Sequence, residues 1–426
     1  MSMMSNDYAV YLPAVNANYA RTIVADLPPD RSLPSGLSLE DFAFWQSDSS
    51  LWNHPYCLHS IGQYSVGSNT SNAMTHRSSA EGLLFGDSGG YQLGGGKLKG
   101  VDGLVPNMSA EDACAVWRSR NEVKAWIVNW LEAYTNYAMT IDVPLWTTLP
   151  KYDGTPFHKC SIEQITGLTV ENLRFIDEHR RGGTKWLNVI QGLDALGMLN
   201  WWDTVKWFDC SGYAFSVEAA KSHGLRAILE PLLTLRDEGA FSSGRDWLHM
   251  LGSSETRWAV LYTAIQMGLR ETNPAMRISF DSSSPFQKAG RYQDYCQVPA
   301  FGSDGKGWSF KWEHVPRSHI YHGSDRPLPF SSPIADKLTL GDLNINPDQY
   351  SVKYFDSLSD LYVMNHNAWV YLSAFQQCND LVFSGRNEGV PSRLKSCVDA
   401  VIEAFKVGNW RSFLESEKGL FDGFRL

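Results

Sequence analysis

The segment GLLFGDSGGYQ (residues 82–92) contains the pattern on which the fold prediction depends. Its apolar first half is followed at once by Asp87, Ser88 and two glycines, which is typical of a buried strand that ends in a tight turn. Seven more short apolar segments lie in the first 290 residues, often separated by stretches with helical periodicity. They are YAVYLPAV (8–15), YCLHSIG (56–62), YAMTIDV (137–143), WLNVIQG (186–192), CSGYAFS (210–216), WLHMLGS (247–253) and RISFDSS (277–283).

Helix signals stand between several of these segments. Ser109, with Asp112 three residues later, forms an approximate capping box, and the periodicity predicts one long helix over 110–134. A second helical segment, TVENLRFIDEHRRGG (169–183), ends on Gly182 and Gly183, a common stop signal.

Alternation of strands and helices indicates parallel βαβ units, and eight of them fit a closed (β/α)₈ TIM-like barrel better than an open sheet. After residue 298 the sequence changes character. Gly, Ser and Pro punctuate 299–350, and helical segments follow over roughly 358–378 and 392–416. We therefore predict an α/β fold with a barrel domain over 1–298 and a partly helical C-terminal appendage over 299–426.

Composition limits the class of protein. With 426 residues and 43% hydrophobic content, the chain can bury a large core. It has neither a run of 18 apolar residues nor an N-terminal secretion signal, so we expect a cytoplasmic protein without membrane contact. Its seven cysteines are scattered without a CxxC pair and are expected to be free thiols. The formal charge of −9 means that any nucleic-acid contact must use a local basic surface.

Polar side chains close four of the predicted strands: Asp87, Asp142, Gln191 and Asp281. Reactive groups of this fold come from the carboxyl ends of the strands, so these four are expected to converge on one pocket. Any one of the aspartates by itself could instead be a helix N-cap or a turn former.

The string GDSGG occurs in two unrelated families. In trypsin-like serine proteases Ser88 would be the nucleophile and would need a histidine base and a buried aspartate. His54 and His59 are the histidines close upstream, neither lies in a matching segment, Tyr91 replaces the usual proline, and the βα alternation contradicts an all-β fold. The protease interpretation is therefore disfavoured.

The same region resembles the tRNA-guanine transglycosylase superfamily, in which DSGG(Y/F)Q follows the third strand of a TIM barrel. The resemblance covers roughly residues 80–292 and a C-terminal segment. Further matches occur in the family's order: Asp142, Val189-Ile190-Gln191-Gly192, Gly212, Phe280-Asp281, and Asn365-His366-Asn367-Ala368-Trp369, which is similar to the family's His-Asn helix start.

The resemblance implies a role for each matching residue. Asp281 would be the nucleophile that forms a covalent glycosyl ester, and Asp87 the acid/base residue. Asp142 would accept hydrogen bonds from the ring N–H and amino group of the base. The remaining substrate contacts would come from Ser88, Gln191, the Gly212 backbone, a stacking Tyr91, and Met250 or Leu251 on the other face of the base.

The chain also departs from the superfamily. The zinc motif of three cysteines is absent, although His366 matches the ligand histidine. His314, His319 and His322 could form a substitute site; we nevertheless predict neither metal nor cofactor. Ser284-Pro285-Phe286-Gln287-Lys288 and Arg291 replace the Pro-Thr-Arg that follows the nucleophile in tRNA enzymes.

These departures make the chain similar to the DpdA-type proteins of bacteriophages and bacterial DNA-modification islands. That similarity implies exchange of guanine in DNA for a 7-deazaguanine such as 7-cyano-7-deazaguanine, in the bacterial host cytoplasm if the gene is a phage's. The target guanine would have to be flipped out of the duplex. Candidate phosphate contacts are Lys97, Lys99, Lys288 and Arg291, which could equally be solvated loop charges. Two alternatives stay open: a tRNA-guanine transglycosylase with a degenerate zinc site, and a barrel that binds a nucleotide without turnover.

Overall fold

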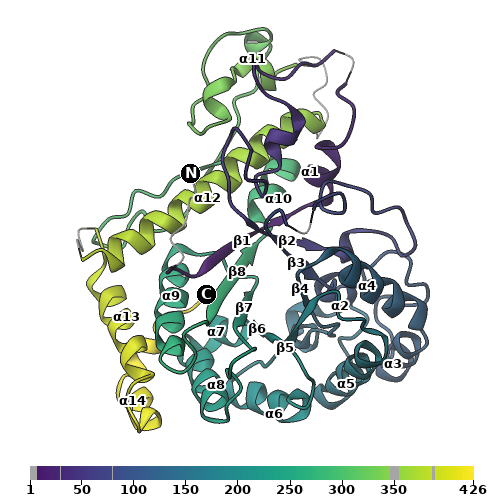
Figure 1. The fold of residues 1–426 in the computed structure, drawn as a ribbon, viewed down its shortest axis with the longest axis vertical. Coiled ribbons are helices and arrows are strands. Elements are labelled where there is room, and N and C mark those ends of the chain that lie inside the picture. Colours follow the sequence, from purple (N-terminus) through teal and green to yellow (C-terminus); the bar gives the residue numbers. More distant parts are fainter. Residues whose placement is uncertain (1–6, 29, 79, 346–354, 386–388) are drawn as a thin grey trace. The chain divides into compact units, whose positions relative to one another are not determined.

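Eight strands form a closed barrel in chain order in the computed structural model of this protein (Figure 1). All eight predicted strands are present. They are β1 (Val10–Val15), β2 (Tyr56–Ser60), β3 (Leu83–Asp87), β4 (Tyr137–Met139), β5 (Lys185–Ile190), β6 (Gly212–Ser216), β7 (Trp247–Leu251) and β8 (Arg277–Ser282). Neighbouring strands from β3 to β8 pair in parallel, which confirms the α/β barrel.

The structure describes residues 7–28, 30–78, 80–345, 355–385 and 389–426. Two compact units can be distinguished within the chain. The first combines residues 1–57, 71–83 and 282–392, and the second combines 58–70, 84–281 and 393–426. The boundary expected after residue 298 falls inside the first unit.

Helices follow most of the barrel strands. Their bounds are α1 (Ala17–Thr22), α2 (Gly90–Gly94), α3 (Ala110–Arg118), α4 (Asn121–Tyr134), α5 (Ile162–His179), α6 (Ala195–Val205), α7 (Glu218–His223), α8 (Arg226–Asp237), α9 (Thr256–Arg270) and α10 (Ser284–Tyr292). The C-terminal segment adds the antiparallel pair β9 (Asp294–Gln297) and β10 (Lys311–His314), then α11 (Leu340–Leu343), α12 (Ser357–Phe383), α13 (Ser392–Ala404), α14 (Trp410–Ser416) and α15 (Lys418–Phe421).

The long helix expected over 110–134 is wrong, because the chain breaks it into α3 and α4. Arg120 takes a non-helical conformation (φ −94°, ψ 51°) between them, and its side chain hydrogen-bonds to the Asp102 carbonyl. The predicted start is confirmed: the Ser109 hydroxyl accepts the Asp112 N–H at 3.0 Å. The tertiary contact of the Arg120 side chain thus overrides the helical periodicity, which continues across residues 119–120.

Aromatic side chains fill part of the barrel interior. The Phe85 ring lies 4.9 Å from both the Tyr137 and the Trp247 rings, and the last two are 5.0 Å apart. Because side chains alternate along a strand, residues two positions further on point to the same side. Asp87 follows Phe85 by two positions, and His249 follows Trp247 by two, so both face the interior beyond this aromatic layer.

The segment matched to a helix start, Asn365 to Trp369, instead lies in the middle of the 27-residue α12. The expectation of a helix start there is wrong, since Asp356 caps the helix nine residues earlier. Buried polar side chains on α12 bind backbone of the same compact unit: Asn367 donates to the Pro285 and Asp294 carbonyls, each at 3.0 Å. Among the helices in the described ranges, none is both long and apolar enough to cross a membrane.

Candidate active site

Three carboxylates come together where β3, β4 and β8 end. Asp87 is the last residue of β3, Asp142 follows β4 by three positions, and Asp281 is the next-to-last residue of β8. Burial raises the pKa of Asp87, and the negative charge of Asp281 raises it further. Burial, followed by the charge of Asp87, raises the pKa of Asp142 to about 7. The structure thus groups the three aspartates that the sequence singled out.

Two glycines set the turn that carries Asp87. The Gly89 N–H donates to Asp87 Oδ1 at 3.1 Å, and Gly89 has φ +88°, which favours glycine. A Cβ on Gly89 would stand 2.8 Å from the Gly62 Cα, so the close approach also requires glycine. The Gly89 hydrogen bond and the nearby Ser60 hydroxyl favour ionisation of Asp87, but burial outweighs them and the pKa stays raised.

The carboxyl group of Asp142 is held from two sides. Gln191 Nε2 donates to its Oδ2 at 2.7 Å, while its Oδ1 would lie 2.6 Å from a Cβ on Gly90. Gln191 also donates to the Val143 carbonyl at 3.2 Å and accepts the Leu145 N–H at 2.8 Å. All of its amide groups are therefore engaged, and Gln191 orients Asp142 in this structure.

Ser88 and Tyr91 take different positions beside this group. Ser88 is 2% exposed, and its hydroxyl donates to the Thr140 carbonyl at 3.1 Å, so no histidine base activates it here. Tyr91, on α2, is 60% exposed, and its ring packs at 5.4 Å against Trp146. Ser88 therefore helps to hold the turn, whereas Tyr91 offers a face to a ligand.

The expected contribution of Gly212 is not present. Gly212 begins β6 and pairs with Leu187 and Trp247, whereas the carboxylates stand at the opposite, C-terminal ends of their strands. A Cβ there would meet the Trp247 carbonyl at 2.1 Å, so the glycine permits strand packing. The expectation failed because Gly212 is the first residue of β6, so its backbone lies at the N-terminal end of the strand.

His249 is a site residue that sequence reasoning missed. Its Nε2 lies 3.3 Å from Asp281 Oδ1, and its side chain is fully buried. The Gly252 N–H donates to the same oxygen at 2.8 Å, so two groups converge on Asp281. Asp281 itself keeps 16% of its side chain exposed, which leaves the carboxylate accessible to a reactant.

Polar contacts behind His249 hold its ring in place. The Trp247 indole N–H donates to Ser279 Oγ at 2.7 Å, and His249 Nδ1 lies 2.9 Å from the same oxygen. An indole N–H can only donate, so Ser279 Oγ accepts a hydrogen bond from Trp247 while it contacts the imidazole. The other ring nitrogen, Nε2, faces Asp281 Oδ1 at 3.3 Å.

A signal for His249 is present in the sequence in retrospect. In WLHMLGS the tryptophan and the histidine are two positions apart, so they share the interior face of β7. The register pairs His249 with Ser279, and Asp281 lies two residues after Ser279. His249 lies next to Asp281 because of the register between β7 and β8. Local sequence patterns do not predict that register.

The two candidates for closing the far face of the base differ in exposure. Met250 is fully buried and pairs with Phe280, so it points away from the carboxylates. Leu251 is partly exposed at the end of β7, next to Gly252. Of the two, Leu251 is the residue placed to contact a ligand.

The histidines considered as metal ligands have other contacts. His366 Nε2 lies 2.9 Å from the Cys296 carbonyl, and burial lowers its pKa to about 4. His314 pairs with Asp294, and His322 Nδ1 lies 3.1 Å from the Asn344 carbonyl. Within the described ranges, no group of three or more His, Cys, Asp or Glu side chains could hold a metal ion. The substitute site at His314, His319 and His322 is therefore not formed.

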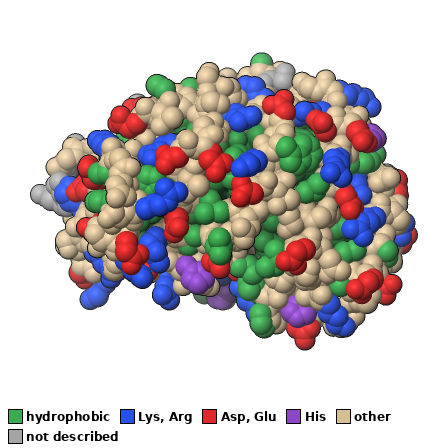
Figure 2. Space-filling view, turned by 90° about the horizontal axis from the view of Figure 1, so that it is seen from below, with side chains coloured by type: hydrophobic (Ala, Val, Ile, Leu, Met, Phe, Trp, Pro, Cys, Tyr) green, Lys and Arg blue, Asp and Glu red, His purple; other side chains and the backbone are tan. Residues whose placement is uncertain are grey.

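The basic candidates are solvent-facing. Lys97 and Lys99 are exposed in the loop after α2, and Lys288 and Arg291 lie on α10. Lys288 Nζ lies over the Tyr292 and Trp312 rings, at 5.2 and 5.7 Å. On the face seen in Figure 2, Lys and Arg alternate with Asp and Glu, without one broad basic patch.

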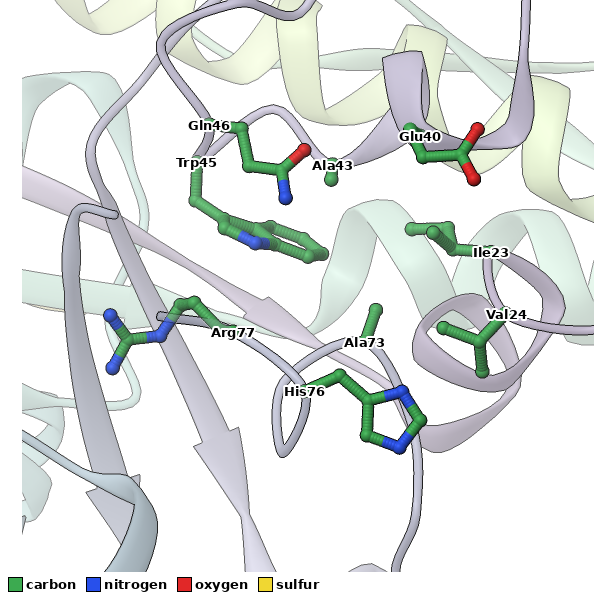
Figure 3. A pocket seen from close by; sticks show the side chains of 9 residues that line it. All are labelled: Ile23, Val24, Glu40, Ala43, Trp45, Gln46, Ala73, His76 and Arg77. Carbon is green, nitrogen blue, oxygen red and sulfur yellow. The ribbon is translucent and has the colours of Figure 1, made fainter. Parts of the chain in front are cut away.

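A surface cavity of about 350 Å³ lies in the first compact unit, with Trp45, Gln46 and Arg77 in its lining (Figure 3). None of its lining residues belongs to the carboxylate group. A comparison of the sequence with protein-family models and with curated proteins gave no match.

Proposed function

We propose that this protein replaces guanine in DNA with a 7-deazaguanine through a covalent glycosyl ester on Asp281. The observation that carries the proposal is that one site holds two carboxyl groups, Asp281 and Asp87, with different surroundings. Asp281 receives the Gly252 N–H and faces His249, whereas the pKa of Asp87 is raised by desolvation and by the charge of Asp281. Carboxyl groups in such different environments suit the roles of nucleophile and proton donor.

The first step forms the ester. The Asp281 carboxylate attacks C1′ of the target nucleotide while the bond from C1′ to the guanine nitrogen breaks. Asp87, whose pKa is raised by burial and by the charge of Asp281, donates a proton to the departing base. The Gly252 N–H, which donates to Asp281 Oδ1, and the nearby His249 ring hold the Asp281 carboxylate in position for attack.

The second step reverses the first with a new base. Asp87, now ionised, takes the ring N–H proton of the 7-deazaguanine, whose nitrogen attacks C1′ and releases Asp281. Asp142, oriented by Gln191, accepts the ring N–H and amino group of either base. Adenine would leave these buried groups unpaired, so it is rejected. The chemistry runs in two displacements, as in a retaining glycosidase.

The order of motifs along the chain supports this assignment over other barrel chemistries. DSGGYQ follows β3, Asp142 follows β4, and Phe280-Asp281 closes β8, in the order seen in the tRNA-guanine transglycosylase superfamily. The DpdA-type branch, which acts on DNA, is favoured because the cysteines of the zinc motif and the Pro-Thr-Arg motif are absent from the sequence.

The test is incubation of the purified protein with 7-cyano-7-deazaguanine and, separately, guanine-containing DNA and bulk tRNA. Nuclease digestion and mass spectrometry then identify the modified nucleosides, with Asp281→Asn as the control. We expect a modified deoxynucleoside that is lost in the control. A modified ribonucleoside would move the proposal to tRNA, and a product that persists in Asp281→Asn would refute the assigned nucleophile.

A further inference from the structure

Three aromatic rings form a continuous row beside the carboxylates. Tyr91 contacts Trp146 at 5.4 Å between ring centroids, and Trp146 contacts Tyr152 at 4.4 Å. Tyr91 is exposed and the other two are partly exposed. All three rings therefore keep surface that a ligand can reach.

Glycines on α2 connect this row to the site. A Cβ on Gly90 would stand 2.6 Å from Asp142 Oδ1, and one on Gly94 would stand 3.2 Å from the Trp146 ring. The same short helix thus touches the base-recognising carboxylate at its first residue and the aromatic row at its last. The row begins next to the site where the target nucleotide reacts.

Lysines flank the row on both sides. Lys97 Nζ lies 6.0 Å from the Tyr91 ring centre, and Lys151 Nζ lies 5.0 Å from the Tyr152 ring centre. Lys151 and Lys221 both pair with Glu218, at 3.2 and 2.5 Å, so these three groups together carry one net positive charge. In a chain of net charge −9, the row is a local surface on which cations accompany three neighbouring, mutually tilted rings.

We infer that Tyr91, Trp146 and Tyr152 are a stacking track for single-stranded DNA, and that Lys97 and Lys151 contact its phosphates. Every base has a flat face, so aromatic rings bind unpaired bases with little sequence preference, and cations beside them follow the backbone. The track binds the unpaired segment next to the flipped guanine. In that last respect the inference rests on the proposed function.

The experiment measures binding apart from exchange. A fluorescein-labelled single-stranded 12-mer of thymidines with one central guanine is titrated with the full-length protein, and anisotropy is read at several salt concentrations. Trp146→Leu and Tyr152→Leu are each expected to weaken binding about 5-fold to 100-fold, the loss of one stacked base. Trp146→Phe, which keeps a ring, should recover most of the affinity.

Matched controls separate the track from general surface effects. Trp207 is 48% exposed in the same compact unit but contacts none of the three rings, so Trp207→Leu should bind normally. Lys97→Gln and Lys151→Gln should each reduce the slope of log affinity against log salt by about 0.7, the value for one lost phosphate contact on a single strand. Thermal melting of each variant identifies any that fail to fold. If a ring variant does not fold, the lysine variants, which change exposed positions, test the track instead.

The outcomes distinguish this inference from the proposed function. Binding that depends on the ring variants but comes without base exchange would support the track and refute the exchange. Exchange that continues with unchanged KM in both Trp146→Leu and Tyr152→Leu, together with unchanged anisotropy, would refute the track and keep the exchange. Equal weakening by Trp207→Leu would also overturn the track.

Discussion

His249 Nε2 lies 3.3 Å from Asp281 Oδ1, and a hydrogen-bonded Trp247 and Ser279 stand behind the imidazole. The carboxylate that we propose as the nucleophile is thus supported by a buried residue on the neighbouring strand. Because His249 is fully buried and its Nε2 faces Asp281, we assign it as a positioning residue for that carboxylate.

The first prediction concerns this support. His249→Gln should lower kcat for base exchange by about 10-fold to 100-fold with little change in KM, because the carboxylate loses a partner that orients it for attack. Ser279→Ala should lower kcat less, since the ring stays but loses its contact with Ser279 Oγ. Steady-state kinetics with a guanine-containing oligonucleotide measure both. Ser373→Ala, a buried serine on α12, is the control, and a change confined to KM would contradict the positioning role.

A second prediction concerns stability. Folding raises the pKa of Asp142 from 3.8 to about 7, so between these values the folded protein keeps a proton that the unfolded chain loses. The free energy of unfolding therefore falls as pH rises from about 4 to about 7. Asp142→Asn removes this effect and should stabilise the protein at pH 8 by on the order of 2 kcal/mol. Urea unfolding of both proteins at pH 4 and pH 8 checks this prediction. An equal difference in the free energy of unfolding at the two pH values would refute it.

The third prediction concerns recognition of the base. Only ionised Asp142 accepts the ring N–H and amino group, and with a pKa of about 7 its ionised fraction rises steeply between pH 6 and pH 8. Affinity for 7-cyano-7-deazaguanine should therefore rise roughly 10-fold over this range. Calorimetric titration of Asp281→Asn measures it without turnover. Asp142→Asn should bind weakly with a flat profile, and an affinity that falls with pH would exclude this role.

A fourth prediction uses two helical glycines. Gly90→Ala would place a methyl group 2.6 Å from Asp142 Oδ1, so it should displace the carboxylate and cost about 1–3 kcal/mol of stability together with base affinity. Gly167, in the middle of α5, has no atom within 4 Å of an added Cβ. Gly167→Ala should instead stabilise the protein by up to about 1 kcal/mol. Melting curves of the two variants decide, and equal behaviour would contradict the close packing.

Local patterns were sufficient for the barrel strands. Each of the eight apolar segments is short, bounded by turn residues and rich in β-forming side chains, properties that depend on near neighbours only. Asp87, Asp142 and Asp281 could be assigned to one group for the same reason, since parallel strands bring their carboxyl ends to a single edge. The break at Arg120 and the two-stranded β9–β10 pair were not predictable, because distant side chains and pairing in space decide them.

The sequence by itself determined which residues end the strands and which glycines permit the Asp87 turn, because both follow from local backbone preferences. Only the tertiary structure decided the pKa values of those residues and which side chains lie next to them. Strand register placed His249 beside Asp281, burial together with neighbouring charge raised the pKa of Asp87 and of Asp142, and packing of α2 brought Tyr91 against Trp146. Desolvation and Coulomb interactions depend on distances through space, and residues far apart in the chain acquire those distances only by folding.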